Sequence, residues 1–341
     1  MACALETLCG QAYRAQQYRK VGIHTYTAIF CLILVCFPLS LLWLYMGRLL
    51  VFIGQDPLIS HEAVHIPLCW ALVFKFELEN IGGALAISIS NWLNAIFLAL
   101  YMWYSPACAK TRVPVATELF QGIGEFFRFA IPSAVMICLE WWSFEVLILL
   151  SGLLPHPELE TSVLSVCLNT ISTLYAIPYG LGAAASTRVS NELGAGNPQA
   201  SRVAVYAAIA LEALNTLIVS GILFASRHVF GYVYSNEKEV VDSVTSMAPL
   251  DCMSVILDGL QGVLQGVARG SGWQHIGAYV NLGAFYLVGI PAAATLAFWL
   301  QLKGIGLWVG IQSGSLTQNI LLAIVTSCVN WEEQTVNTEL H

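Results

Sequence analysis

The chain has 341 residues, of which 57% are hydrophobic and only 10% are charged. A soluble domain carries about 25% charged residues, so this composition excludes an ordinary soluble protein and predicts an integral membrane protein. The formal charge of −7 comes from scattered acids, with no basic block. Nucleic-acid binding is therefore not expected.

The N-terminal stretch MACALETLCGQAYRAQQYRK does not have the pattern of a signal peptide, because it lacks a basic start and Glu6 interrupts its apolar part. Eight later runs are apolar enough to span a bilayer, which takes about 20 residues. Backbone groups in hydrocarbon must bond internally, and alternating strand patterns are absent, so these runs are predicted to be helices. They are 25–46, 81–104, 129–154, 161–187, 203–226, 244–268, 276–302 and 305–331.

A shorter apolar run, 64–74, is too short to cross unaided. If it does not cross, nine Lys and Arg residues lie on one side of the membrane and five on the other. If it does cross, the split becomes seven and seven. Cytoplasmic loops carry the excess of positive charge. The bias therefore predicts that 64–74 does not cross and that the loops 105–128 and 188–202 are cytoplasmic.

The stretch Gly180-Leu-Gly-Ala-Ala-Ala185 matches a glycine-rich dinucleotide-binding pattern. That pattern needs a strand before it and an acid about 20 residues further on. Here it lies inside the uncharged run 161–187, so we interpret its small residues as sites of close helix packing. The following Gly194-Ala-Gly-Asn-Pro198 is predicted to end this helix at the cytoplasmic face.

Residues 2–15 align with residues 182–195 at an offset of 180, which indicates an internal repeat. Parallel halves are typical of transporters with a substrate site near the middle of the membrane. The halves are unequal, and the repeat predicts that one helix and most of another are missing near Ala63–Val64. The matched pairs include Thr7 with Thr187, Gln11 with Asn191, and Ala15 with Ala195.

Several segments resemble plant MATE (multidrug and toxic compound extrusion) transporters. They are ACALETLCGQAY, VFIGQDPLIS, ELFQGIGEFFRFAIPSAVMICLEWWSFE, YAIPYGLGAAASTRVSNELGAGNP and GVARGSGWQHIGAYVNL. The resemblance implies an all-α, polytopic helical bundle with two six-helix lobes. It places an incomplete N-terminal lobe at 1–104, lacking helices 1 and 4 and most of 5, and a cytoplasmic linker at 105–126. A complete C-terminal lobe at 127–331 and a cytoplasmic tail at 332–341 follow, and Arg14 stands where the family prefers glycine.

Ionisable side chains deep in a span cost about 2.5–3.5 kcal/mol to insert, so they are candidates for function. Glu140 lies near the middle of 129–154, and Asp258 a little past the middle of 244–268. Apolar surroundings favour the neutral form of a carboxyl group, as proton exchange requires. The resemblance implies that Glu140 and Asp258 are the proton-coupling acids.

Glu145, Asp251 and Glu212 are weaker candidates, for which a structural role is the alternative. Glu145 lies about 140° round the helix from Glu140, so the two do not share a face. Amide and aromatic side chains could contact an organic cation, although packing or lipid contact is the alternative for each aromatic. The candidate substrate-binding residues are Trp142, Asn169, Tyr175, Tyr179 and Gln261, with Trp141 as a further aromatic.

Pro132, Pro178 and Pro291 are predicted to bend their helices, as hinges or as plain kinks. Five of the ten cysteines lie in apolar runs without a CxxC pair, which favours small buried hydrophobes over disulfides or metal ligands. These cysteines are Cys31, Cys36, Cys138, Cys167 and Cys252. No metal site is expected, and no cofactor beyond a proton gradient.

The sequence favours a monomeric, proton-coupled antiporter that exports organic cations, xenobiotics or secondary metabolites by alternating access, from the plasma membrane or the vacuolar membrane. The alternative is a truncated, non-transporting remnant or a splice or gene-model product of such a transporter. An enzyme is not expected, because no nucleophile–base pair is present. A channel or receptor is disfavoured because nothing resembles a selectivity filter or a ring of like charge.

Overall fold

The computed structural model describes residues 4–44, 122–235 and 237–339, with single positions between 96 and 120. The elements within these ranges are all helices. They belong to two compact units, one formed by Met1–Gln17 with Gly122–His341 and the other by Tyr18–Gln121. In the second unit, α2 (Tyr18–Leu44) contains most of the predicted run 25–46. The run 64–74 and the gap at Ala63–Val64 lie outside the described residues.

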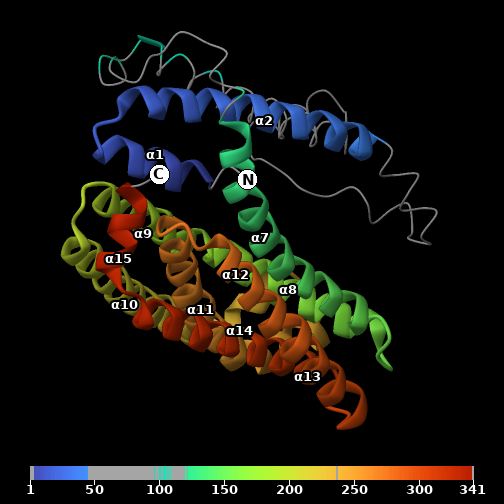
Figure 1. Ribbon diagram of the computed structural model, residues 1–341. Coiled ribbons are helices and arrows are strands. Elements are labelled where there is room, and N and C mark those ends of the chain that lie inside the picture. The colour runs from blue at the N-terminus through green and yellow to red at the C-terminus, as the bar shows by residue number, and fades with distance from the viewer. Residues whose placement is uncertain are drawn as a thin grey trace. The chain divides into compact units, whose positions relative to one another are not determined.

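The first unit is a bundle of long helices (Figure 1). Four of its helical stretches are long and apolar enough to cross a membrane, namely Ile123–Ser151, Pro198–Val233, Lys238–Gly270 and Gln274–Trp299. The elements are α1 (Ala4–Arg14), α7 (Ile123–Ser151), α8 (Pro157–Leu174), α9 (Ala176–Gly194), α10 (Pro198–Phe230), η3 (Gly231–Val233), α11 (Lys238–Gly270), α12 (Gln274–Asn281), η4 (Leu282–Gly289), α13 (Ile290–Ala294), η5 (Thr295–Trp299), α14 (Lys303–Cys328) and α15 (Trp331–Glu339).

The predicted helix 161–187 is two helices in the structure. The helices α8 and α9 meet at Tyr175 and bend by 40°, so they form a fifth candidate span only if counted together. Pro178 explains the break, because its ring clashes with the carbonyl four residues earlier, on Leu174, where α8 ends. The prediction of one straight helix was therefore wrong at this point, whereas the bend predicted for Pro178 is confirmed.

The other two prolines behave differently. Helix α7 continues without a break through Pro132. Pro291 is the second residue of the short α13, which lies between the π-helical segments η4 and η5. Such wide turns are a usual response to an inserted proline or an extra residue, so Pro291 alters its helix locally without ending it.

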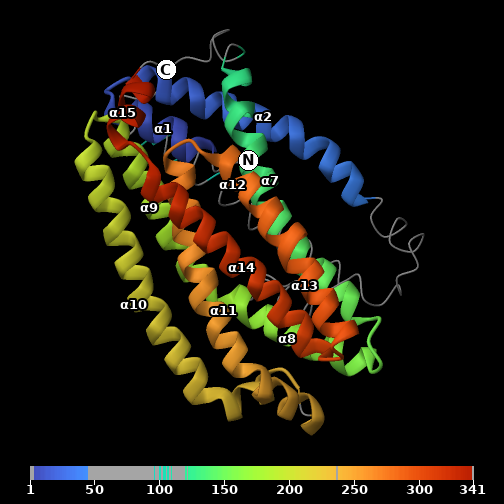
Figure 2. The ribbon, with the colours of Figure 1, turned by 60° about the horizontal axis from the view of Figure 1, so that its bottom comes forward.

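Helices α9 and α11 approach at backbone distance, and the two lie side by side in Figure 2. A Cβ on Gly266 would overlap the backbone of Gly182, and a Cβ on Gly182 would overlap that of Gly262. One turn further on, a Cβ on Gly270 would come 2.5 Å from the carbonyl oxygen of Ser186. Small residues spaced by four allow this approach, which confirms the packing interpretation at Gly182, whereas a Cβ on Gly180 would have no neighbour within 4 Å.

The repeat at an offset of 180 is visible in two turns with the same hydrogen bonds. Ala15 N donates to Gln11 O over 3.1 Å, and Ala195 N to Asn191 O over 3.0 Å. The next two amides follow the same pattern in both copies. Residue 16 has φ +59° and residue 196 has φ +72°, so each copy ends its helix with one left-handed residue. The predicted helix end at 194–198 is confirmed, since α10 begins at Pro198.

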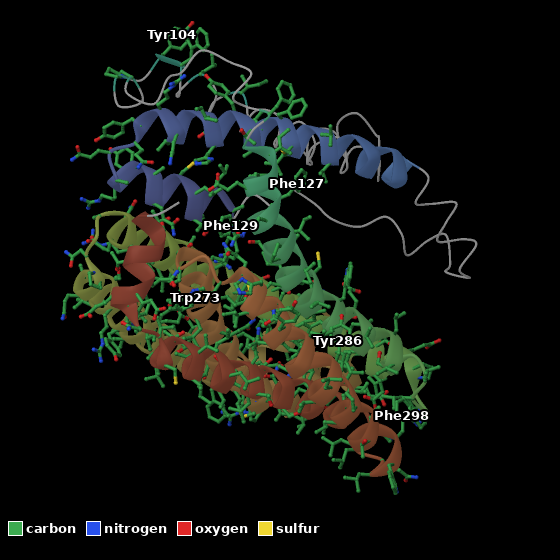
Figure 3. The ribbon with its side chains drawn as sticks, viewed as in Figure 1. Tyr104, Phe127, Phe129, Trp273, Tyr286 and Phe298 are labelled. Carbon is green, nitrogen blue, oxygen red and sulfur yellow. The ribbon has the colours of Figure 1, made fainter. Side chains whose placement is uncertain are left out.

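Helix α1 packs against α9 and belongs to the same unit as the C-terminal helices, which differs from the predicted division at residues 104 and 127. The predicted tail 332–341 contains most of α15. The ring of Trp273, labelled in Figure 3, packs 6.0 Å between centroids from that of Trp331 at the start of α15.

Candidate functional site

The two acids singled out by the sequence lie in the interior of the same unit. Glu140 on α7 is 8% exposed and Asp258 on α11 is 6% exposed. Both line one cavity of about 20 Å³ between α7, α8 and α11. That volume holds about one water molecule, so the two carboxyl groups face a shared space that only a water or a proton can occupy.

Amide side chains surround the Glu140 carboxyl group. Gln265 Nε2 donates to Glu140 Oε2 over 2.6 Å, and the side chains of Gln261 and Gln318 also face this group. Gln318 Nε2 in turn donates to Asn281 Oδ1 over 2.6 Å. Amides stay neutral at every pH. They therefore orient the carboxyl group without supplying a counter-charge.

Asp258 has fewer partners. Its Oδ1 is buried without a hydrogen bond, and the side chain of Ser315 on α14 faces this carboxyl group. The charges of Glu140 and Asp258 act on each other. Two carboxylates in one small, water-poor space repel, and burial of their charges is costly. Ionisation of both groups at once is therefore disfavoured.

The structure places two of the five predicted substrate-binding residues beside the acids. Gln261 is 1% exposed, and Tyr175 lines the cavity from the break between α8 and α9. Tyr179 is 46% exposed, and its ring lies tilted against that of Tyr175 at 6.4 Å between centroids. Trp142 is 59% exposed, and Asn169 is also at the surface of the unit. These last three therefore do not line the cavity.

The sequence alone indicates Trp141 only as a further aromatic and does not identify Gln265. Trp141 lines the cavity although part of its ring is exposed, and Gln265 makes the shortest contact to Glu140. The signal that identifies Gln265 is its position on α11. It lies seven residues from Asp258 and four from Gln261, which places all three on one helical face.

The weaker acid candidates lie elsewhere. Glu145 is exposed on the surface of α7. Asp251 is 2% exposed and faces Cys167 of α8. Glu212 is fully buried, accepts a hydrogen bond from Asn215 Nδ2 over 3.2 Å, and packs against Gly259. Only Glu140 and Asp258 share a cavity.

A larger groove of about 640 Å³ lies between α9 and α10, away from the acids. Its lining is mostly alanine and leucine, with polar groups only near one end. The polar residues of this lining are Arg188, Asn197 and Gln199.

In the described ranges, no three His, Cys, Asp or Glu side chains gather as a metal site. Cys31, Cys167 and Cys252 are free and buried, as small apolar side chains would be. The prediction of no metal site overlooks one pattern, His61-Glu-Ala-Val-His65, whose spacing is typical of zinc helices. That pattern crosses the predicted gap at Ala63–Val64 and lies outside the described residues.

Comparison with known proteins identifies the family. A family model described as MatE matches residues 1–87 and 132–295. Protein DETOXIFICATION 12 of Arabidopsis thaliana is 57% identical over an aligned stretch of 376 residues, covering 98% of this chain and 78% of that protein. Protein DETOXIFICATION 13 of the same plant is 56% identical over the same coverage. The aligned stretch is longer than the 341-residue chain, so the relative contains residues that have no counterpart here.

Solved structures agree. The crystal structure of the eukaryotic MATE transporter AtDTX14 superposes with a TM-score of 0.92 at 53% identity, over 99% of this chain and 85% of that one. An outward-facing multidrug resistance MATE family transporter of the MOP superfamily shares the fold, with a TM-score of 0.79 at 12% identity. The chain is therefore a multi-pass membrane protein that belongs to the MATE family of transporters.

Proposed function

We propose that this chain is a proton-coupled antiporter that exports organic cations, xenobiotics or secondary metabolites, acting as a monomer in the plasma membrane or the vacuolar membrane. The observation that carries the proposal is the Glu140–Asp258 pair facing a cavity of about 20 Å³. A buried carboxyl pair in so small a cavity can gain and lose a proton as its surroundings change.

Glu140 and Asp258 have different hydrogen-bond partners, and this difference is compatible with a proton that the two carboxyl groups share. Glu140 is oriented by the amide of Gln265, whereas Asp258 keeps one oxygen without a hydrogen bond. A proton held by the pair removes the repulsion between the two side chains. Its loss restores that repulsion and pushes α7 and α11 apart at this level. Movement of these helices would change the surface that a substrate contacts.

The substrate would bind outside this small cavity, because an organic cation is far larger than one water molecule. The exposed Trp142, Tyr179 and Asn169 lie on nearby helices and offer aromatic faces and an amide. Aromatic faces attract organic cations. These residues remain our candidates for substrate contact.

The proposal is tested by export of ethidium, an organic cation, from proteoliposomes with an imposed pH gradient. Glu140→Gln keeps the size of the side chain and one acceptor oxygen but cannot ionise, so proton-driven export should fall to the level of empty vesicles. Asp258→Asn should do the same. Glu145→Gln removes an exposed carboxylate from the same helix and should leave export unchanged. Full proton-driven export by Glu140→Gln would show that Glu140 is not the proton site.

A second candidate, a chain that does not complete transport, is favoured by the residues of the relatives that have no counterpart here. Alternating access requires both halves of a repeat transporter to move around one site. The test compares this chain with a version in which the corresponding segment of a relative is inserted between Ala63 and Val64. Export by the longer version alone would support this candidate, and equal export by both would exclude it.

A further inference from the structure

A line of polar residues runs along α11 from the proton site to the end of the helix. Asp258, Gln261, Gln265 and Arg269 follow one another at intervals of three, four and four residues, so they share one face. All four side chains are at most 6% exposed. Asp258 and Arg269 are eleven positions apart in the sequence, which corresponds to about 16 Å along the helix axis. The buried polar side chains of α11 therefore extend from the acid pair to the end of the helix at Arg269.

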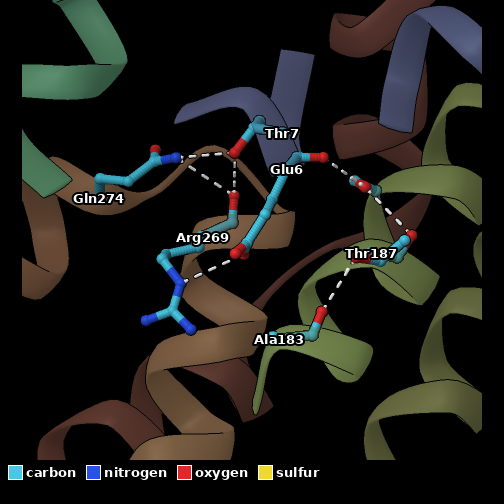
Figure 4. Close-up of polar contacts among 7 residues, drawn as sticks. Glu6, Thr7, Ala183, Thr187, Arg269 and Gln274 are labelled. Atoms are coloured by element: carbon cyan, nitrogen blue, oxygen red, sulfur yellow. Dashed lines mark hydrogen bonds and ion pairs between the residues drawn. The ribbon is translucent and has the colours of Figure 1, made fainter. Parts of the chain in front are cut away.

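At the far end of this line, Arg269 holds α1. Its guanidinium Nε lies 3.5 Å from Glu6 Oε2, and the arginine is only 3% exposed whereas the Glu6 side chain is 23% exposed. The carbonyl of Arg269 accepts a hydrogen bond from Thr7 Oγ1 over 2.6 Å and one from Gln274 Nε2 over 3.2 Å (Figure 4). Gln274 Nε2 also donates to Thr7 Oγ1 over 2.8 Å. The same residue therefore binds α1 by its side chain and by its backbone.

Arg269 also acts on the proton site. Its positive charge attracts Glu140, whose amide partner Gln265 lies one turn before Arg269 on the same face of α11. The other titratable groups facing Glu140 are Asp258 and Tyr175. Arg269 is thus a buried cation between two carboxyl groups, Glu140 within the C-terminal helices and Glu6 on α1.

We propose that Arg269 is a positioning residue that couples the charge of Glu140 to a latch between α1 and the C-terminal helices, formed by the ion pair with Glu6. When Glu140 is ionised, the guanidinium has two anions and can leave Glu6 at lower cost. When Glu140 is neutral, the guanidinium keeps its ion pair with Glu6, because a buried charge cannot go unpaired without a large penalty. Protonation of Glu140 therefore tightens the latch.

The latch lies at the end of the unit that the charge bias predicts to face the cytoplasm. Arg188 of α9 is paired with Glu192 over 2.9 Å at this end, and Arg14 of α1 lies 3.9 Å from the same carboxylate. Because α1 belongs to the first half of the repeat and α11 to the second, the latch joins the two halves on that side. The inference rests on the proposed function only in treating Glu140 as the proton site.

The test is hydrogen–deuterium exchange of the α1 peptide, residues 4–14, in the full chain reconstituted in lipid nanodiscs and measured at pH 8. Arg269→Gln should raise α1 exchange roughly tenfold, the equivalent of about 1.4 kcal/mol of local opening. Glu140→Gln, which mimics the neutral acid, should lower it several-fold relative to the unchanged chain. Arg269→Lys keeps the charge and should retain most of the protection.

The decisive comparison is the double variant. If Arg269 carries the coupling, Glu140→Gln should no longer change α1 exchange when Arg269→Gln is also present. An undiminished effect of Glu140→Gln in that background would overturn the proposal, and so would wild-type α1 exchange in Arg269→Gln. If Arg269→Gln does not fold, as judged by exchange of α14, Glu6→Gln replaces it and should abolish the same response.

A matched control is Arg188→Gln, which removes an exposed positive charge at the same end and should leave the response to Glu140→Gln intact. Failure of the latch and failure of the proposed function are separable. If Glu140→Gln abolishes ethidium export but leaves α1 exchange unchanged, only the coupling is wrong. If export persists in Glu140→Gln, the proton site itself is wrong.

Discussion

Two equivalent regions, residues 4–17 and 184–197, form the same turn with different partners. Both end a helix through the same three backbone hydrogen bonds and one left-handed residue. The equivalent positions Glu6 and Ser186 then contact neighbouring residues at the end of α11. Glu6 pairs with Arg269, while the backbone of Ser186 lies against Gly270. The two turns therefore share their backbone geometry. Their side chains differ, so α9 is held against α11 by backbone packing and α1 by an ion pair.

The two copies also touch each other at equivalent positions. Gly10 of the first copy and Ser190 of the second differ by the repeat offset of 180, and a Cβ on Gly10 would overlap the Ser190 hydroxyl group. That hydroxyl group donates to Glu6 O over 3.0 Å. A contact between equivalent residues is what an approximate two-fold relation between the copies requires. Substitutions at three places test this comparison, and they follow in order of decreasing expected effect.

The largest effect should come from the second copy, where α9 packs on α11. Gly266→Val would place a branched side chain in the backbone of Gly182, at a cost of about 3 kcal/mol or more. We expect loss of folded protein or a marked fall in melting temperature, measured in detergent. Gly180→Val on α9 is the control, because no atom lies within 4 Å of the position of its Cβ. Equal stability of the two variants would contradict the close packing of α9 on α11.

An intermediate effect is expected where the copies meet. Gly10→Ser should destabilise by about 1–3 kcal/mol, because two hydroxymethyl groups would compete for one space. Adding Ser190→Gly moves the hydroxymethyl group from one copy to the other and should recover most of the loss. A double-variant cycle on the melting temperature measures this coupling. Additive losses would mean that the two positions are not in contact.

The smallest effect concerns the left-handed residues. Gln16 adopts φ +59° where the second copy has Gly196 at φ +72°. A side chain in this region costs about 1–2 kcal/mol, so Gly196→Gln should lower the melting temperature slightly. Gln16→Gly should raise it by less, since glycine also loses more chain entropy on folding. The opposite signs are the expected result, and a stabilising Gly196→Gln would contradict the turn geometry.

The sequence predicted most of what depends on local pattern. The apolar runs located the helices of the C-terminal unit, and the buried acids stood out because charge is rare in such runs. The offset of 180 anticipated a repeat that the turns display. The helix end at Gly194 followed from its own glycine and proline signals.

Other features depend on contacts between distant residues, which no local pattern contains. The packing of α1 on the C-terminal helices joins residues more than 260 positions apart, such as Thr7 and Arg269. Gln265 was passed over because an amide in a helix has no distinctive spacing until its partner on α7 is known. Trp142 and Tyr179 were grouped with Tyr175 by residue type, but the turn of each helix points them to the surface.

The backbone contact between α9 and α11 has a mechanical consequence. With glycine at their points of closest approach, the two helices have little room to slide past one another, so we expect them to move as one lever. The 40° bend at Tyr175 lies just outside this lever, where α8 begins to diverge. Torque generated at Asp258 would then turn α9 together with α11, and the pivot would be the tyrosine that lines the acid cavity.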